Sequence, residues 1–377
     1  MPEKKKQHFV PQFYLRNFSK DASEKCISIF NIARRKVIGS ASLKDQCYED
    51  YFYGKDLIAE NMFSVIEGQA SKVISGIIDR NEVPRKLSPE HDTLLMHVLM
   101  QHARTKHMAD STEQQVGEFA KIILSKKTSV SEYLNEVSIR LTEPTEIPIS
   151  VAIKGRPLLD DLHFKILINA TDVDFITSDN PVVRRNQFAC GRKTFNNIGF
   201  ACIGLQIFFP LSPKHIVIFY DSKIYKIGSK NSTECIIKNK SDVHRLNELQ
   251  VLNADENLYF SDVGQKSNVF SAFFSSLSFH SKNRPILEEG PAQDQGNGRF
   301  GSMVRMHTPE QSKKLELSFV KLHRLISRDE LDHVGPLVRN VDMVYAVQEF
   351  QRLVDRGIYR INEFNDYLAS KRTDYRM

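Results

Sequence analysis

The sequence lacks tryptophan and has little cysteine, with five cysteines among 377 residues. The cysteines are scattered and include no Cys-x-x-Cys pair: Cys26, Cys47, Cys190, Cys202 and Cys235. A disulfide scaffold or a cysteine-rich zinc site requires paired or closely spaced cysteines. We therefore expect reduced thiols in a cytoplasmic protein.

Long hydrophobic runs are also missing. The most apolar stretch, around residues 198–211, is interrupted by Gly204, Gln206 and Pro210, so it is too short to cross a bilayer. The basic beginning of the chain is not followed by an apolar segment, so we expect no secretory signal. The sequence predicts no membrane association.

Several enzyme motifs are absent as well. The sequence contains no GxxxxGK phosphate loop, no GxGxxG after a strand and no GxSxG nucleophile turn. These absences argue against P-loop ATPases, Rossmann enzymes and α/β-hydrolases. The formal net charge is +6, from 52 basic and 46 acidic residues. This mild excess permits a polyanionic partner without requiring one.

The residues that are present predict an α+β fold. Hydrophobic residues make up 41% of the chain, enough for a substantial core. Helical spacing of apolar residues comes first and strand-like runs follow, which predicts a helical N-terminal half packed on a mostly antiparallel sheet. The expected helices cover residues 56–79, 88–107 (restarting towards 124), 131–141 and 241–256. The expected strands include a hairpin near residues 26–41 and several short runs between 149 and 227.

The C-terminal part is expected to be a helical appendage. Residues 288–304 are rich in glycine and polar residues, which predicts a flexible linker or loop. Helical patterns then cover residues 309–332, 336–356 and 362–371. We therefore divide the chain into an α+β domain at 1–287, the linker at 288–304 and a helical extension at 305–377.

The segment HFVPQFYLRNFS, residues 8–19, is the most distinctive part of the sequence. Pro11 is suited to the first turn of a short helix, which places His8 just outside the helix N-terminus. There the helix dipole lowers the proton affinity of an imidazole, so His8 is a candidate base or phosphate contact and Gln12 a candidate ligand contact. The structural alternative is that the aromatic residues fill the core while His8 caps a backbone group.

Gln101 and Arg104 extend the apolar face of the helix predicted at residues 88–107. A buried guanidinium needs an acceptor, either a carboxylate or a ligand oxygen. Glu67 and Asp179 are the candidate carboxylates. Gln101 and Arg104 are therefore either substrate contacts or part of a structural ion pair that joins the two halves of the fold.

Ser178, Asp179 and Asn180 precede Pro181 at the end of a predicted strand. Carboxylates at strand ends often project into a crevice, so Asp179 is the leading candidate for a general base or a metal ligand. Ser178, Asn180 and Asn247 are candidate substrate contacts. Ordinary turn chemistry explains the same Asp-Asn-Pro pattern equally well.

Taken together, these segments resemble a bacterial family catalogued as domain-of-unknown-function family 4238. The resemblance rests on HFVPQFYLRNFS, MQHARTKH, FITSDNPVV, FFPLSPKH and RLNELQVLNADENLYFS, and it covers about residues 8–262. It implies a bacterial protein often found among mobile or defence-associated genes, and no established activity. The family often has Arg-Thr-Pro where this chain has Arg104-Thr105-Lys106, so the helix is expected to continue further here.

We weigh three functions. The first is a defence or toxin-like effector enzyme acting on nucleic acid or nucleotides, in which His8, Asp179 and Glu67 are catalytic and a divalent cation assists phosphodiester hydrolysis. The second is a non-catalytic sensor that binds a ligand and signals through C-terminal helices, which would bind a protein partner or oligomerise. The third is an interaction protein whose polar residues lock two halves together. The first hypothesis predicts that His8 meets Arg104 and Asp179 in space.

Overall fold

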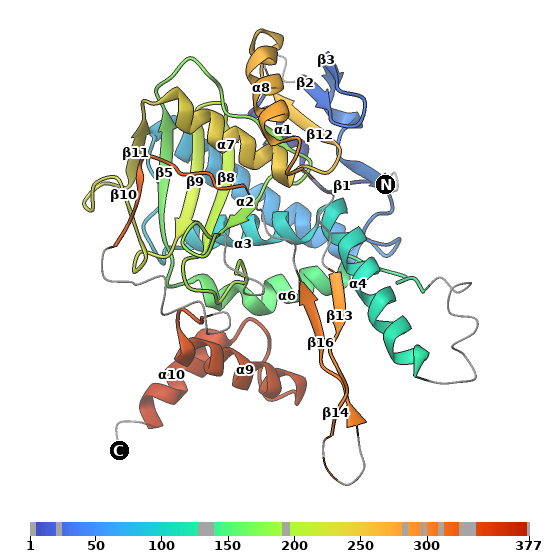
Figure 1. Cartoon of the computed structure of the whole chain (residues 1–377). Coiled ribbons are helices and arrows are strands. Elements are labelled where there is room, and N and C mark those ends of the chain that lie inside the picture. Colours follow the sequence, from blue (N-terminus) through green and yellow to red (C-terminus); the bar gives the residue numbers. More distant parts are fainter. Residues whose placement is uncertain are drawn as a thin grey trace.

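The computed structural model covers the whole chain and shows an α+β fold with mostly antiparallel sheets, as predicted (Figure 1). It describes residues 5–19, 25–126, 139–190, 197–280, 286–294, 296, 300–307, 313–323 and 337–374. The helix predicted at residues 131–141 lies almost entirely outside the described residues.

The N-terminal motif forms a short strand and a short helix. Strand β1 (Lys6–His8) pairs with β4 (Tyr48–Asp50), and α1 (Gln12–Arg16) follows Pro11. The predicted hairpin is confirmed as β2 (Cys26–Asn31) and β3 (Lys36–Ser42). The buried apolar residues of the motif anchor it to the main core: Phe9, Val10, Tyr14, Leu15 and Phe18.

Three predicted helices are confirmed in the first half of the chain. They are α2 (Ile58–Arg80), α3 (Pro89–Ala103) and α4 (Lys106–Ser125). Ser88 caps α3 by accepting the backbone N–H of His91, as its position before Pro89 suggests. The expectation that this helix continues past Arg104 is wrong, because Thr105 caps a new helix by accepting the N–H of Met108.

A helix that the sequence did not predict, α6 (Glu146–Gly155), follows. Its Pro148 lies in the first turn, where the missing N–H costs no helical hydrogen bond. Pro148 is therefore compatible with a helix at a place where the sequence predicted strands. A short 3₁₀ turn, η2 (Arg156–Leu159), leads from α6 into the sheet.

The central layer is a five-stranded sheet in the order β11-β5-β9-β8-β7. Its strands are antiparallel except for the parallel β11–β5 pair. The strand bounds are β5 (His163–Asn169), β7 (Val183–Arg185), β8 (Gln206–Ser212), β9 (His215–Tyr220) and β11 (Glu234–Ile237). Both faces of this sheet are covered, which explains why β8 and β9 are buried along their whole length.

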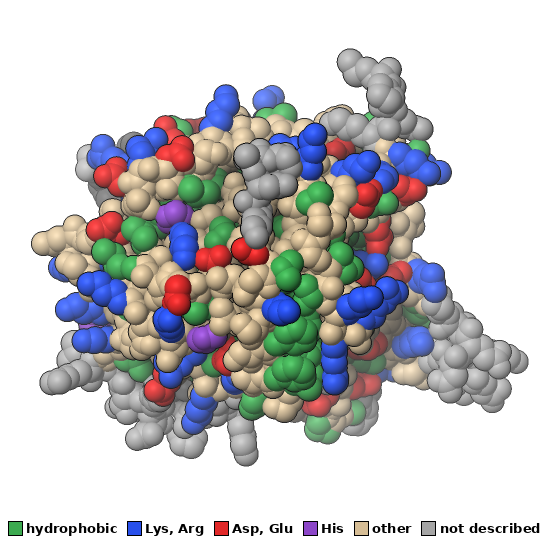
Figure 2. Space-filling model, turned by 90° about the horizontal axis from the view of Figure 1, so that it is seen from above, with side chains coloured by type: hydrophobic (Ala, Val, Ile, Leu, Met, Phe, Trp, Pro, Cys, Tyr) green, Lys and Arg blue, Asp and Glu red, His purple; other side chains and the backbone are tan. Residues whose placement is uncertain are grey.

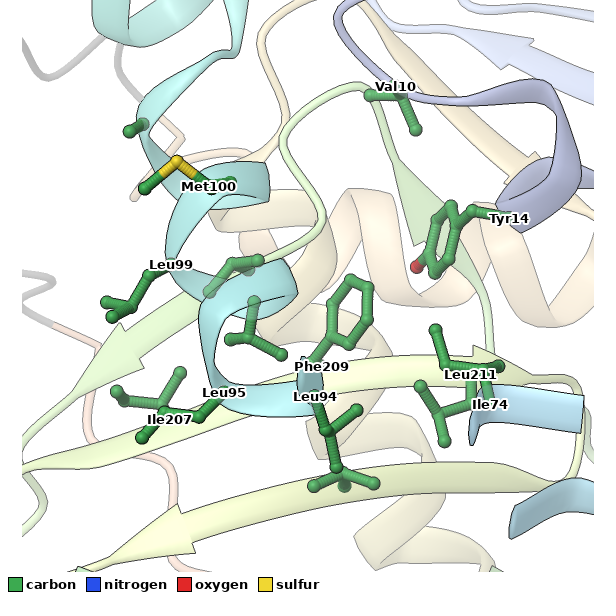
Figure 3. Close-up of a cluster of buried hydrophobic side chains, with 14 of the residues drawn as sticks. Val10, Tyr14, Ile74, Leu94, Leu95, Leu99, Met100, Ile207, Phe209 and Leu211 are labelled. Atoms are coloured by element: carbon green, nitrogen blue, oxygen red, sulfur yellow. The ribbon is translucent and has the colours of Figure 1, made fainter. Parts of the chain in front are cut away.

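The two faces carry separate cores. On one face, Ile207, Phe209 and Leu211 of β8 pack against helices α2 and α3 and against Tyr14, whose ring stacks on Phe209 at 4.9 Å (Figure 3). On the other face, Phe208 packs with residues of α7 (Lys240–Asn253). Figure 1 shows α7 lying over the strands on that side. Alternation of side chains along β8 supplies both cores.

A four-stranded antiparallel sheet in the order β3-β2-β12-β6 lies beside the first one. It contains β6 (Thr177–Ser178) and β12 (Asn257–Phe260), and α8 (Lys266–Ser276) packs on it through Val269 and Phe273. The N-cap of α7 is Asn239, whose side chain accepts the N–H of Ser241, so the helix begins slightly before its predicted start at residue 241.

The C-terminal third differs from its prediction. Part of the segment 288–304, predicted as a linker or loop, lies in paired strands that form a ribbon (Figure 1). These are β13 (Ile286–Glu289), β14 (Gln293–Asp294), β15 (Phe300–Gly301) and β16 (Val304–His307). Gly296, whose φ is 86°, lies between the paired strands β14 and β15, so a glycine in this segment belongs to a hairpin.

The helix expected at residues 309–332 is not present in its described part. Strand β17 (Val320–Leu322) lies there and pairs with β10 (Tyr225–Ile227). The last two predicted helices are confirmed as α9 (Val341–Asp355) and α10 (Phe364–Asp374), which pack together through Phe350 and Tyr367.

Among the described residues, no helix has the length and hydropathy that a bilayer crossing requires. All five cysteines are free thiols.

Candidate functional site

His8 lies at the end of β1, half-buried beside α1. Its Nε2 lies 3.1 Å from the Gln12 side-chain nitrogen and 3.3 Å from the carbonyl oxygen of Lys44. To accept a hydrogen bond from Gln12, Nε2 must be unprotonated, and to donate one to Lys44, it must carry a proton. The imidazole tautomer therefore decides which of the two hydrogen bonds forms. Burial lowers the pKa of His8, which keeps the ring neutral at pH 7.

Arg104 is the centre of a buried polar cluster, which we call the Arg104 cluster and which also contains Gln101 and Glu67. The guanidinium is 1% exposed and donates to Glu67 at 2.6 Å and to Gln101 Oε1 at 2.9 and 3.2 Å. It also lies 4.8 Å from the centre of the Phe63 ring. The cluster therefore contains its own counter-charge.

The Arg104 cluster ties the N-terminal motif to the helices. Gln101 donates to the backbone carbonyl of Phe9 at 2.9 Å. The Tyr53 hydroxyl lies 3.3 Å from the carbonyl oxygens of both His8 and Arg104. His8 and Arg104 thus approach each other through their backbones, with Tyr53 between them.

Amide side chains of α7 hold the irregular segment at residues 174–182. Asn247 accepts the N–H of Ile176 at 3.1 Å and donates to the carbonyl of Asp174 at 2.9 Å. Gln250 accepts the hydroxyl of Ser178 at 3.0 Å. The Asn180 side chain donates to the Asn253 carbonyl at 3.0 Å. The predicted contacts Ser178, Asn180 and Asn247 are therefore engaged within the protein.

Asp179 is held by the backbone at the start of β12. Its two carboxylate oxygens accept the N–H groups of Asp255, Glu256 and Asn257 at 2.7 to 2.8 Å. Burial raises the pKa of Asp179 to about 6, although the three N–H donors favour the ionised form and oppose the shift. A carboxyl group with this pKa changes its protonation state close to neutral pH.

One side of Asp179 faces a pocket of about 200 Å³, which we call the Asp179 pocket. Its lining residues come from the β4 region, the start of α4 and the segment before β12: Phe9, Asp45, Gln46, Cys47, Tyr48, Glu49, Lys106, His107, Asp179, Asp255, Glu256, Asn257 and Tyr259. The pocket therefore lies where the N-terminal motif, the α3–α4 junction and the four-stranded sheet meet.

The buried wall of the pocket carries a thiol and a phenol. Cys47 has a left-handed backbone conformation, with φ at 51°, and its Sγ lies 3.1 Å from the Tyr259 hydroxyl. Burial raises the pKa of the Cys47 thiol well above its usual value. The thiol is therefore protonated at neutral pH and is not an activated nucleophile.

The polar rim of the pocket is mostly acidic. Lys106 pairs with Glu49 at 2.5 Å, and His107 Nδ1 lies 3.6 Å from Asp255 Oδ1. Glu256 is exposed and makes no ion pair within the part of the chain that the structure describes. Sequence reasoning did not select His107, Asp255, Glu256 or Cys47 as site residues. His107, Asp255 and Glu256 do lie in MQHARTKH and RLNELQVLNADENLYFS, the segments that carried the family resemblance.

The predicted site residues fall into separate groups. His8 and Gln12 contact each other, Glu67 and Gln101 contact Arg104, and Ser178, Asn180 and Asn247 belong to the α7 contacts described above. Of all of them, Asp179 is the one that lines the Asp179 pocket. Phe9 links the Arg104 cluster to the Asp179 pocket. Its carbonyl oxygen accepts a hydrogen bond from Gln101, and Phe9 also lines the pocket. In the described parts of the chain, no group of three or more His, Cys, Asp or Glu side chains is arranged to hold a metal ion.

Residues 6–263 match the model of a family described as proteins of unknown function, DUF4238. The chain belongs to this family. The match covers the N-terminal motif, α3, the segment at residues 174–182 and β12, so all residues of the Asp179 pocket lie inside the DUF4238 region. No curated protein and no solved structure matches the chain.

Proposed function

We propose that the chain binds a small organic cation, such as a protonated amine or a guanidinium group, in the Asp179 pocket. The observation that carries this proposal is the charge of the lining. Five carboxylates face two basic side chains there: Asp45, Glu49, Asp179, Asp255 and Glu256 against Lys106 and His107. Clefts lined by one sign of charge concentrate ligands of the opposite sign.

The internal contacts leave this acidic surplus in place. Glu49 is neutralised by Lys106, and Asp45 by Lys6 at 3.1 Å, outside the lining. Asp179 receives backbone N–H groups only, which carry no full charge. Asp255 has the imidazole of His107 beside it, and Glu256 lies exposed at the rim. Asp179 and Glu256 therefore supply negative charge for a ligand.

The pKa of Asp179 gives the binding a pH dependence. A cation interacts with the ionised carboxylate, and protonation removes that interaction. Because the pKa of Asp179 is raised to about 6, affinity should increase as the pH rises through 6. An organic cation also requires no coordination set of the kind that a divalent ion needs.

Calorimetric titration of the full chain with butane-1,4-diamine at pH 7 tests the proposal. We expect binding that weakens about twofold to fivefold in Glu256→Gln, the loss typical of one exposed charge pair. Asp355→Asn is the matched control, because it removes one exposed carboxylate from the end of α9. Absent binding, or equal binding by the Glu256→Gln variant, would contradict the proposal. Binding of Mg²⁺ but not of the diamine would contradict an organic-cation site and indicate a metal site.

A second candidate is an enzyme that acts on nucleic acid or nucleotides as a defence effector. It is favoured by one observation, that Asp179 and the His107–Asp255 pair line the same pocket, where they could exchange protons with a substrate. The acidic lining would repel phosphate unless a divalent cation were bound between them. Lys, Arg, Asp and Glu side chains are also interspersed over the face shown in Figure 2, without a basic tract.

The enzyme candidate is tested by incubating purified protein with DNA, RNA and nucleotides, with and without Mg²⁺. His107→Gln should abolish any turnover that depends on this pocket. Equal turnover by the wild type and this variant would remove the pocket from the chemistry.

A further inference from the structure

Arg185, at the end of β7, is a buried arginine whose hydrogen bonds are incomplete. Arg185 is 4% exposed. Nη2 donates to the carbonyl oxygens of Lys313 at 3.0 Å and Leu315 at 3.4 Å. Nε and Nη1 are buried and have no hydrogen-bond partner among the described residues. Since a guanidinium keeps its charge at neutral pH, this is a buried cation with unused donors.

Two other buried arginines, Arg104 and Arg339, each have a carboxylate. Arg104 contacts Glu67 at 2.6 Å, and Arg339 contacts Asp161 at 2.8 and 2.9 Å. Among the described residues, the groups that act electrostatically on Arg185 are Cys190 and Tyr225, which are neutral when protonated. Burying a charge without a partner is strongly unfavourable, so Arg185 is expected to meet an anion.

A second donor lies beside Arg185. Gln206 of β8 is directly opposite Arg185 in the strand register, which places both side chains on the same face of the sheet. Gln206 is fully buried; its Oε1 accepts the N–H of Gln187 at 3.2 Å, and its Nε2 has no partner among the described residues. The two side chains thus present donors from three nitrogen atoms: Arg185 Nε, Arg185 Nη1 and Gln206 Nε2.

We infer that Arg185 and Gln206 form a binding site for a small oxyanion, a carboxylate or a phosphate group. Oxyanions supply the negative charge and the acceptor atoms that this pair lacks. The site is covered by residues 313–322, which contribute Leu315, Leu317 and Val320 to the core on this face of the sheet. It is therefore assembled from the DUF4238 region and from the segment that follows it, and it is distinct from the acidic Asp179 pocket.

Thermal unfolding of the full chain in sodium phosphate, in sodium acetate and in sodium chloride of equal ionic strength tests this site. A ligand that binds the folded state raises the Tm with its concentration. We expect phosphate or acetate, but not chloride, to raise the Tm of the wild type. In Arg185→Met this increase should disappear, with affinity reduced at least tenfold. Gln206→Leu should weaken it while keeping the buried charge.

The matched control is Arg184→Met. Arg184 is the neighbouring arginine on β7, where it points to the opposite face, donates to the Ile198 carbonyl at 3.1 Å and lies over the Phe200 ring. In Arg184→Met, phosphate or acetate should still raise the Tm as it does in the wild type. An equal Tm increase in Arg185→Met would show a non-specific salt effect and overturn the inference.

The absence of any increase over chloride in the wild type would also overturn it. In that case the buried Oε1 of Gln187, which has no partner in the described structure, would be the internal acceptor for these donors. A response to phosphate alone, or to acetate alone, identifies which oxyanion the site accepts.

Discussion

The Arg104 cluster and the Asp179 pocket are both polar, both buried at their centres and joined through Phe9, yet their charges are balanced differently. In the cluster, the guanidinium is matched by Glu67 and by the amide oxygen of Gln101. In the pocket, carboxylates outnumber basic side chains, and there is space of about 200 Å³ beside them. The polar residues on the apolar helix face are therefore balanced by internal partners, whereas the pocket lining keeps an excess of carboxylates.

The largest effect should come from removing the centre of the Arg104 cluster. Arg104→Ala leaves Glu67 without its counter-ion and Gln101 Oε1 without its donor. Breaking a buried pair in this way costs about 3–5 kcal/mol of unfolding free energy. Urea denaturation measures it, with the exposed Arg80→Ala at the end of α2 as the control. A loss below about 1 kcal/mol, the value of a surface ion pair, would show that the cluster is not a structural lock.

A smaller effect should come from the α7 contacts that support Asp179. Asn247→Leu keeps the number and branching of the side-chain heavy atoms but leaves the N–H of Ile176 and the carbonyl of Asp174 without partners. Each buried group left unsatisfied costs about 1–3 kcal/mol. The same denaturation assay measures the loss, and hydrogen exchange at Ile176 should accelerate. Unchanged exchange there would contradict the proposed support.

The smallest effect should be a pH dependence that belongs to Asp179. Because its folded pKa is raised to about 6, its stabilising contribution is complete below the unfolded pKa and is lost as the pH rises through 6. Between pH 5 and pH 7 the wild type should therefore lose about 1 kcal/mol relative to Asp179→Asn, which does not titrate. Denaturation at both pH values gives the difference, and parallel profiles would contradict it.

The sequence was sufficient to predict the elements that have strong local signals. Ser88 before Pro89 marked the start of α3, and the spacing of apolar residues marked α2, α9 and α10. The prediction failed where tertiary pairing decides the conformation. Residues 320–322 form a strand because β10 offers a free edge, and that edge is encoded about a hundred residues earlier.

The site was harder to predict than the fold. Asp179 was selected for its place at a strand end, and it does line a pocket. Its neighbours Asp255 and Glu256 were not selected, because their approach depends on the pairing of β12 with β6. Gln101 and Arg104 were correctly identified as out of place, but a sequence cannot show that Glu67 and Arg104 satisfy each other.

The contacts from α7 have a consequence for how the pocket responds to its surroundings. Asn247, Gln250 and Asn253 hold the backbone around Asp179 with carboxamide groups, which neither gain nor lose protons in the physiological range. Acidification therefore changes the charge of Asp179 without changing the protonation of the amide groups that hold residues 174–182. A ligand released by a drop in pH would leave this amide-held segment in position, so that neutralising the medium restores the charged carboxylate at the same place.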